Sequence, residues 1–497
     1  MANQQTSQLK KTAKHSAVYG IGTALRQLTG LVMLPIYTRY LSPADYGVVE
    51  LLTMTVTFVS IFIGLRISQA MFRYFVLAET PDEKNLIVST VMHTIIATSS
   101  IGSLALYFAA EPAARILFGN SDYLYEVQLF SITIMLGAVA DVGMSYIRAR
   151  QLPVLFVVVG AVTLILQVTL NVIFVVILDM HVRGVVYSVL ISGVVVASVL
   201  ALYVFGQTGL RYSITIAGTL VRFIIPLIFA SVAAFYVNFG DRYFLRIFGG
   251  LAEVGIYALA WRISSVLSTV FEAFNMSWSA DQFEVVKKRN AQETFNQIFR
   301  VLAAALFLSG TGIALFASDF FRIMTAPEFY AASDAVPIMV FAIIFQVMTN
   351  FCQFGIVYKE RTRHIAEANW IKALVATAGF LLIIPYLGSV GAAMAVLLAQ
   401  ISAFGWSYLK SKSLYDMGLT WSPVNVMGVI AISCIVIGYL LPEGEIIYFI
   451  ARILIYAMLI VLFYKVPNWS ESEKQFMRQS ILRLAAIVKK PLLRSHS

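Results

Sequence analysis

Charged side chains lie inside long apolar segments of this chain, and these are the residues whose chemistry needs an explanation. The acids among them are Glu50, Asp141 and Glu272, and seven basic residues share this setting: Arg26, Arg66, Arg222, Arg262, Arg300, Lys372 and Arg452. A charge at the centre of a bilayer-spanning helix costs at least about 2.5–3.5 kcal/mol. Each such group therefore requires a water-filled cavity or a partner of opposite charge.

Arg26 belongs to a polar stripe along one face of the first predicted helix, with Tyr19, Thr23, Gln27 and Gly30. Lipid cannot solvate this stripe. Either it faces a cavity, where Arg26 would attract an anion, or Arg26 forms a structural ion pair with a carboxylate such as Glu50. The excess of basic over acidic groups within the helices indicates an anionic cargo, and the candidate cations are Arg26, Arg262, Arg222 and Lys372.

Tyr257, Trp261 and Ser265 lie on one face of a second polar helix, predicted at 251–273. Aromatic rings and hydroxyls suit sugar stacking and hydrogen bonding, although serine-rich faces are equally common where membrane helices pack. Arg262 borders this face, and a guanidinium can hold a phosphate through two parallel hydrogen bonds.

The three intramembrane acids have two readings. A carboxylate in the membrane can bind a proton or a sodium ion and so couple transport to an ion gradient. For Glu50 and Glu272 we favour charge balance for nearby arginines. Asp141 has no oppositely charged neighbour in the sequence before Arg148, so it is the better candidate for ion coupling.

The residues do not assemble an enzyme, metal or cofactor site. Five histidines are scattered without metal-ligand spacing, and both cysteines, Cys352 and Cys434, lie in apolar runs. The longest predicted outer loops, 238–250 and 318–333, lack the paired carboxylates of acid–base catalysis. No catalytic residue or cofactor is assigned, and a membrane polymerase or glycosyltransferase is the less favoured alternative.

The elements that hold these residues are transmembrane helices. The chain has 497 residues, of which 59% are hydrophobic and 12% charged, against roughly 25% charged in soluble domains. A spanning helix needs about 20 mostly apolar residues. Fourteen segments qualify: 16–38, 44–66, 86–110, 124–146, 153–177, 184–206, 215–237, 251–273, 295–317, 334–357, 366–386, 389–409, 424–441 and 446–465. The predicted fold is an all-α polytopic membrane protein.

Basic residues indicate the orientation of these helices. With the N-terminus inside, 23 of the 36 basic residues fall in cytoplasmic segments and six in outer loops. Lysine and arginine gather in cytoplasmic loops, so we expect both termini in the cytoplasm. The net charge of +10 is explained by this bias and does not indicate nucleic-acid binding.

A motif near the N-terminus returns in the second half of the chain. In LPIYTRYLSPADYGVVELL, Ser42, Asp45 and Gly47 match Gly250, Glu253 and Gly255 of the later stretch at a constant offset of 208. Ser42 is expected to cap the helix that follows it, with Pro43 in its first position. Each half then holds six helices in the same orientation, as in parallel transporter repeats.

The repeat gives the predicted domain organisation: a cytoplasmic segment 1–15, a first lobe 16–206, a linker 207–214, a second lobe 215–410, two extra helices in 424–465 and a tail 466–497. In the tail, apolar residues line one helical face and basic residues lie elsewhere. We expect an amphipathic helix on the cytoplasmic leaflet.

LPIYTRYLSPADYGVVELL and the later DRYFL…EVGIYALAWRI resemble the Wzx-type O-antigen and exopolysaccharide flippases. These belong to the multidrug/oligosaccharidyl-lipid/polysaccharide exporter superfamily. The resemblance implies two six-helix lobes around a central cationic cavity, in which arginines of helices 1 and 8 matter. By position these are Arg26 and Arg262.

The resemblance also implies a substrate and a location. The substrate is an undecaprenyl-pyrophosphate-linked oligosaccharide, moved by alternating access without ATP across the bacterial inner membrane. The intramembrane carboxylates described above add H⁺ or Na⁺ as the expected coupling ion. Polysaccharide polymerases and glycosyltransferases are the implied partners. A multidrug or metabolite antiporter and a lipid II flippase of the same superfamily are the alternatives.

Overall fold

All of the secondary structure in the described residues is helical. The structure is a computed structural model that describes residue 30 and residues 33–63, 67–442, 444–465 and 469. The chain forms two compact units: the first holds residues 1–258 and 324–329, the second 259–323 and 330–497. Arg26 and the predicted amphipathic helix of the tail lie outside the described residues.

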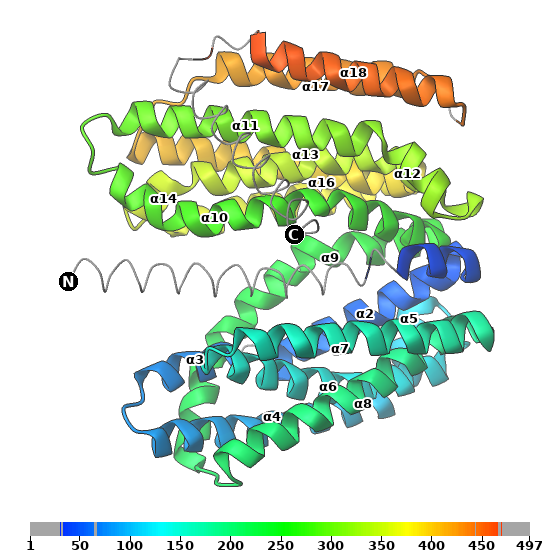
Figure 1. Cartoon of the computed structure of the whole chain (residues 1–497), viewed down its shortest axis with the longest axis vertical. Helices are drawn as coiled ribbons and strands as arrows, with labels where there is room; N and C mark the ends of the chain where they lie inside the picture. The colour runs from blue at the N-terminus through cyan, green and yellow to red at the C-terminus, as the bar shows by residue number, and fades with distance from the viewer. Residues whose placement is uncertain (1–29, 31–32, 64–66, 443, 466–468, 470–497) are drawn as a thin grey trace, which may run out of the picture. The chain divides into compact units, whose positions relative to one another are not determined.

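The first unit contains a helical stretch at residues 33–40 and most of the N-terminal half of the chain. Its labelled helices in Figure 1 are α2 (Pro43–Ile63), α3 (Ile67–Leu77), α4 (Pro81–Phe108), α5 (Ala110–Phe118), α6 (Leu124–Ala149), α7 (Pro153–Asn171), α8 (His181–Thr208) and most of α9 (Ile214–Ser264). A π-helical segment, Val172–Ile177, extends α7, and a 3₁₀ turn, Pro327–Phe329, also belongs to this unit.

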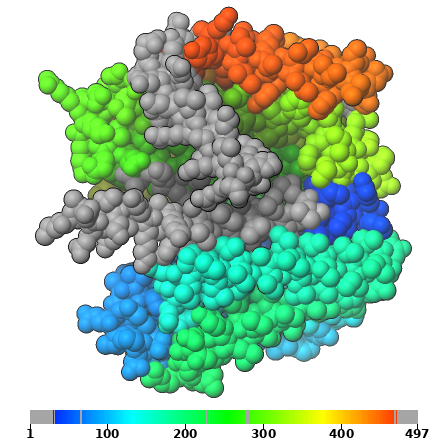
Figure 2. All heavy atoms as spheres, in the orientation of Figure 1, coloured from blue at the N-terminus to red at the C-terminus, as the bar shows by residue number. Residues whose placement is uncertain are grey.

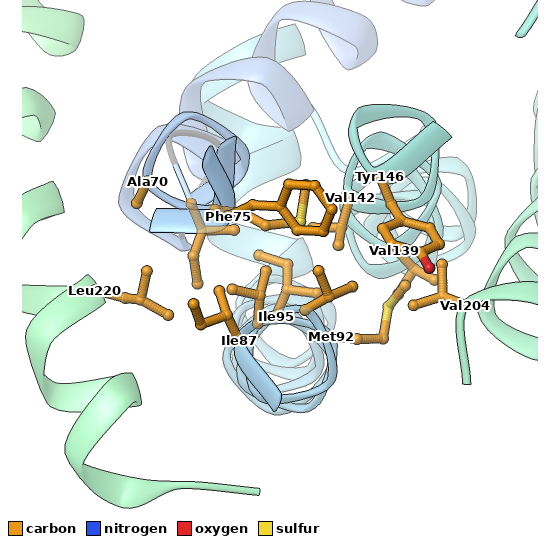
Figure 3. Close-up of a cluster of buried hydrophobic side chains, with 14 of the residues drawn as sticks. Ala70, Phe75, Ile87, Met92, Ile95, Val139, Val142, Tyr146, Val204 and Leu220 are labelled. Carbon is orange, nitrogen blue, oxygen red and sulfur yellow. The ribbon is translucent and has the colours of Figure 1, made fainter. Parts of the chain in front are cut away.

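An apolar core of the first unit joins α3, α4, α6, α8 and α9. Figure 3 shows Phe75, Met92, Val142 and Tyr146 pointing toward one another, each at most 8% exposed. Leu220 of α9 belongs to the same core. A second cluster packs Phe235 of α9 against Met54 and Ile61 of α2. These contacts pack α2 against α9 within the first unit.

The second unit contains the remaining helices. They are α10 (Val266–Val285), α11 (Ala291–Leu315), α12 (Ala317–Met324), α13 (Ala332–Cys352), α14 (Phe354–Tyr358), α15 (Arg363–Leu382), α16 (Ile384–Leu414), α17 (Trp421–Tyr439) and α18 (Ile446–Lys465). Here α16 packs against α13 and α15, and α11 packs against α13 and α17. Trp278 of α10 stacks on Phe351 of α13 with ring centroids 5.5 Å apart.

The predicted fold is confirmed. Among the described residues, twelve helices are long and apolar enough to cross a membrane. Most of the first predicted helix, 16–38, lies outside that set, and a single span of the set, Leu227–Thr269, runs through the predicted helices 215–237 and 251–273. About fourteen helices are therefore compatible with the structure. Apolar side chains of α7 and α18 remain exposed, and the atoms of both helices lie at the surface in Figure 2, as expected of lipid-facing helices.

One predicted loop is wrong. Residues 238–249 continue α9 as a helix, and the backbone leaves helical geometry only at Gly250, with φ +83°. Polar residues and three glycines made 238–250 look like a loop, but Asp241 and Arg242 are buried and paired with each other. The compact units accordingly divide within α9, whereas the predicted linker 207–214 corresponds to the break between α8 and α9.

Candidate functional site: a buried charge cluster on α2 and α9

The first copy of the repeated motif forms the N-terminus of α2 as its sequence predicts. The Ser42 hydroxyl accepts a hydrogen bond from the Asp45 amide at 3.1 Å, and Asp45 Oδ2 accepts from the Ser42 amide and hydroxyl at 3.1 and 2.8 Å. This reciprocal cap satisfies backbone donors that the helix itself cannot. The predicted cap is confirmed, and it fixes where α2 begins and which face presents Glu50.

The second copy starts a new helical segment without a loop. Gly250 interrupts α9, and the Glu253 side chain folds back toward Gly249, where an added Cβ would lie 2.8 Å from Glu253 Cγ. The positive φ of the backbone at position 250 favours glycine, which has no Cβ. The interruption allows Tyr257 of the later segment to meet Asp241 of the earlier one.

Four side chains from α2 and α9 form a buried charge cluster: Glu50, Asp241, Arg242 and Tyr257. Arg242 is completely buried, with Nη1 2.9 Å from Asp241 Oδ1 and Nε 3.5 Å from Glu50 Oε1. The Tyr257 hydroxyl donates to Asp241 Oδ2 at 2.5 Å. The guanidinium also lies over the Tyr257 ring, 5.2 Å from its centroid.

The charges of this cluster do not cancel. Two carboxylates and one guanidinium leave a formal charge of −1 on helices that are long and apolar enough to cross a membrane. A buried charge is retained only where it is paired and hydrogen-bonded. Within the cluster, Glu50 is the most accessible member, with 16% of its side chain exposed. Binding of one proton or monovalent cation at the carboxylates would neutralise the excess.

The cluster changes the interpretation of two residues. Glu50 has an arginine partner, as charge balance requires, and the described partner is Arg242. Arg242 itself was predicted in an outer loop, which is wrong, because α9 continues through that position and buries it. Asp241 and Arg242 were missed as buried charges within a helix. The signal that could have found them is their adjacency, since neighbouring opposite charges can enter an apolar segment as a pair.

Asp141 lies on α6 and is half-buried. Its Oδ2 accepts a hydrogen bond from the Ser68 hydroxyl of α3. Among the described residues, no basic side chain comes within ion-pair distance of this carboxylate, and Arg148 of the same helix donates to the Ser145 hydroxyl instead. A carboxylate held by a hydroxyl can take up a proton without leaving a buried cation unpaired.

The other predicted site residues are spread over both units. Arg222 is exposed on α9, Arg262 is half-buried near the end of α9, and Lys372 is buried on α15. Glu272 of α10 is exposed. Of the predicted site residues, the structure brings Glu50 and Tyr257 together around Arg242.

The predicted sugar-contacting face divides in the structure. Trp261 and Ser265 are half-buried, and the Ser265 hydroxyl donates to the Arg262 carbonyl at 2.9 Å. Tyr257, in contrast, is 0% exposed and its hydroxyl is engaged by Asp241. It therefore has no free surface for a sugar here, and we assign it to the charge cluster.

Arg452 is another buried cation, and its contacts are structural. On α18 of the second unit, its Nη1 donates to Asp319 Oδ1 at 2.8 Å, and the same guanidinium reaches the carbonyls of Gly438, Leu441 and Pro442 at 3.2–3.4 Å. These carbonyls lie at and just beyond the C-terminus of α17, where carbonyl groups need donor partners outside the helix ladder. Arg452 thus joins α17 to α18. Among the described residues, no group of three or more His, Cys, Asp or Glu side chains could hold a metal.

Comparison with known proteins gives the fold and the family. Lipid II flippase MurJ in an inward closed conformation matches with a TM-score of 0.71 at 12% identity, covering 91% of this chain and 98% of that one. A multidrug resistance MATE transporter of the MOP superfamily, in an inward-facing conformation, matches at 0.59 and 16% identity, covering 78% and 95%. A Vibrio cholerae MATE transporter mutant matches at 0.55 and 15%, covering 83% and 99%. At these identities the likeness shows the fold.

Comparison of the sequence with family models identifies the family. A search of curated protein sequences finds no match to this chain. The family described as "Polysaccharide biosynthesis protein" matches residues 12–278, which is more than half of the chain and includes both copies of the repeated motif. The chain therefore belongs to the polysaccharide biosynthesis protein family and has the helical fold of the MOP-superfamily transporters.

Proposed function

We propose that this protein is a flippase that moves an undecaprenyl-pyrophosphate-linked oligosaccharide from the cytoplasmic to the outer leaflet of the bacterial inner membrane. The observation that carries the proposal is the family match over residues 12–278 in a chain with a transporter fold. Cell-surface polysaccharides are assembled on lipid carriers, and a polytopic protein devoted to that synthesis is well placed to move the carrier. Polymerases and glycosyltransferases are its expected partners.

The substrate's head group explains why cations should lie within the helices. A pyrophosphate and any acidic sugars are anionic, and guanidinium groups bind phosphate oxygens in pairs. We assign Arg26 and Arg262 to this role, with Arg222 and Lys372 as further contributors. Trp261 and Ser265 supply a ring and a hydroxyl for the sugars, and the prenyl chain remains in the lipid throughout.

Energy for the cycle is proposed to come from an ion gradient, with alternating access and without ATP. Asp141 is the favoured coupling group, since its described partner is a serine hydroxyl and protonation breaks no ion pair. Protonation of Glu50 would give up its contact with Arg242 at 3.5 Å, while Arg242 would keep Asp241 as its partner at 2.9 Å. Glu272, exposed on α10, remains a third candidate.

Complementation of a deletion strain tests this function. We expect the intact gene to restore surface glycan and to clear accumulated lipid-linked oligosaccharide. Arg26→Gln and Arg262→Gln should each reduce export at least tenfold while membrane levels stay normal. Arg115→Gln is the matched control, because Arg115 is exposed and pairs with Glu111 one helical turn away. Full complementation by both Arg26→Gln and Arg262→Gln would contradict the assignment.

Two structurally similar proteins suggest alternatives to this function. A lipid II flippase is favoured by the similarity to MurJ, and a multidrug antiporter by the similarity to the MATE transporters. Lipid II translocation predicts rescue of peptidoglycan synthesis in cells depleted of their own flippase. An antiporter predicts resistance to cationic dyes on overexpression. Either result, without restored surface polysaccharide, would replace our proposal.

A further inference from the structure

The two copies of the repeated motif lie directly against each other within the first unit. The offset of 208 that relates Gly47 to Gly255 also relates Pro43 to Leu251. These four residues lie at the start of α2 and just after the break in α9, and we call them the glycine crossing. Its contacts join residues of one copy to the equivalent residues of the other.

The contacts are reciprocal. A Cβ added at Gly47 would lie less than 3.0 Å from the carbonyl oxygen of Leu251 and 3.2 Å from the Gly255 nitrogen. A Cβ added at Gly255 would lie less than 3.0 Å from the carbonyl oxygen of Pro43 and 3.0 Å from the Gly47 nitrogen. Gly47 therefore faces Leu251, four residues before Gly255, and Gly255 faces Pro43, four residues before Gly47. Such an exchange is what a two-fold axis between two equivalent helices produces.

Glycine is required here by the backbone of the other helix. The groups in the way are carbonyl and amide atoms, which cannot rotate aside as a side chain can. Small residues let two membrane helices approach until their backbones touch, and such contacts depend on van der Waals packing without a hydrophobic contribution. A gap of about 0.5–1 Å between the surfaces already forfeits a quarter to a half of this attraction. The glycine crossing is therefore held by contacts that weaken steeply as the two helices separate.

Further contacts join the same segments. Tyr46, beside Gly47, meets Phe329 edge to face with ring centroids 6.1 Å apart, and both residues belong to the first unit. Glu50 lies one turn beyond Gly47, and Tyr257 lies two residues beyond Gly255, so the charge cluster adjoins the crossing. The ring contact and the charge cluster therefore flank the glycine crossing.

We propose that the glycine crossing is a reversible latch that parts and re-forms during each transport cycle. The inference rests on the proposed transport function. Transporters built from two repeats expose the substrate site by parting the repeats at one end, and the crossing is where the two copies of the repeated motif touch. A contact made by two glycine backbones re-forms with no side chain to reorder, which suits repeated opening.

Thiol labelling tests the latch without a transport assay. In a background carrying Cys352→Ala and Cys434→Ala, single-cysteine proteins Tyr46→Cys and Val88→Cys are treated in membranes with N-ethylmaleimide. Both native side chains are buried, at 3% and 0% exposure. A latch that parts predicts that Cys at position 46 reacts at least tenfold faster than Cys at position 88. Equal, slow labelling of the two positions would overturn the proposal.

A glycine substitution links the labelling to the crossing itself. Adding Gly255→Ala to the Tyr46→Cys protein should wedge the helices apart and raise the labelling rate a further threefold or more. Gly137→Ala is the matched control, because an added Cβ there meets nothing within 4 Å. The proposal fails where Gly255→Ala and Gly137→Ala label at the same rate.

A cross-link connects the latch to transport. Cross-linking the double variant Tyr46→Cys, Phe329→Cys with a bifunctional methanethiosulfonate should close the contact covalently and reduce glycan export at least tenfold, and dithiothreitol should restore it. Undiminished export by the cross-linked protein means that the crossing is static. Absence of export by the parent protein would instead count against the proposed function, and the labelling rates would still decide the latch.

Discussion

Arg242 shows how a single side chain determines what its neighbours can do. It is fully buried and pairs with both Asp241 and Glu50, so it offsets one of the two negative charges in the described cluster. Removing one member of a buried ion pair leaves an uncompensated charge, and this costs more than the pair contributes. The cluster's stability therefore depends on the balance of its charges as well as on the number of its contacts.

A double-mutant cycle on this cluster makes the point testable. Arg242→Met leaves two unbalanced carboxylates and should lower the free energy of unfolding by about 3–5 kcal/mol, seen as a fall in the melting temperature of the detergent-purified protein. Glu50→Gln leaves one carboxylate with one guanidinium and should have little effect. The double variant should melt above Arg242→Met. Arg222→Met, an exposed change on the same helix, is the control, and additive effects would contradict charge balance.

At the scale of the helix, α17 and α18 are joined by one arginine. Arg452 lies 2% exposed and ties Asp319 of α12 to the carbonyls that end α17. A guanidinium has five donors in a fixed plane and can serve several acceptors at once, whereas an ammonium is a compact point charge. The hairpin formed by α17 and α18 should therefore depend on arginine at this position.

Substitution of Arg452 should loosen this hairpin. Arg452→Met leaves Asp319 buried without its cation and should cost about 3 kcal/mol or more, with faster proteolysis in the loop after α17. Arg452→Lys should recover only part of the loss. Arg363→Lys is the matched control, because Arg363 is exposed and pairs with Glu367 on its own helix. Unchanged melting and proteolysis for Arg452→Met would show that packing alone holds the hairpin.

Hydropathy predicted the helices well because the bilayer demands about 20 apolar residues for each span. The predicted segment 124–146, for example, is observed as α6, Leu124–Ala149. The prediction for 238–250 failed for a physical reason, since Arg242 is buried against Glu50, nearly two hundred residues away in the sequence. A local pattern carries no information about that partner. The cap at Ser42 was predictable because both of its members lie within one turn.

For the whole molecule, the repeat was visible in the sequence, but its geometric consequence was not. The offset of 208 identified equivalent residues, whereas only the structure shows that Gly47 and Gly255 meet each other. The candidate cations were found from their apolar setting alone, and their joint action on one substrate remains a prediction. The orientation of the chain likewise rests on where its basic residues gather.

Cysteine labelling from one side of the membrane tests that orientation. The single-cysteine variants Asn120→Cys, Lys288→Cys and Lys359→Cys are made in the background without native cysteines. Position 120 lies between α5 and α6, and positions 288 and 359 follow α10 and α14. Lysine-rich connections stay in the cytoplasm because their charge opposes translocation. We therefore expect an impermeant maleimide to label position 120 in intact cells, and to label positions 288 and 359 only after permeabilisation. Labelling of position 288 in intact cells would reverse the orientation, and with it the leaflet at which the glycine crossing opens.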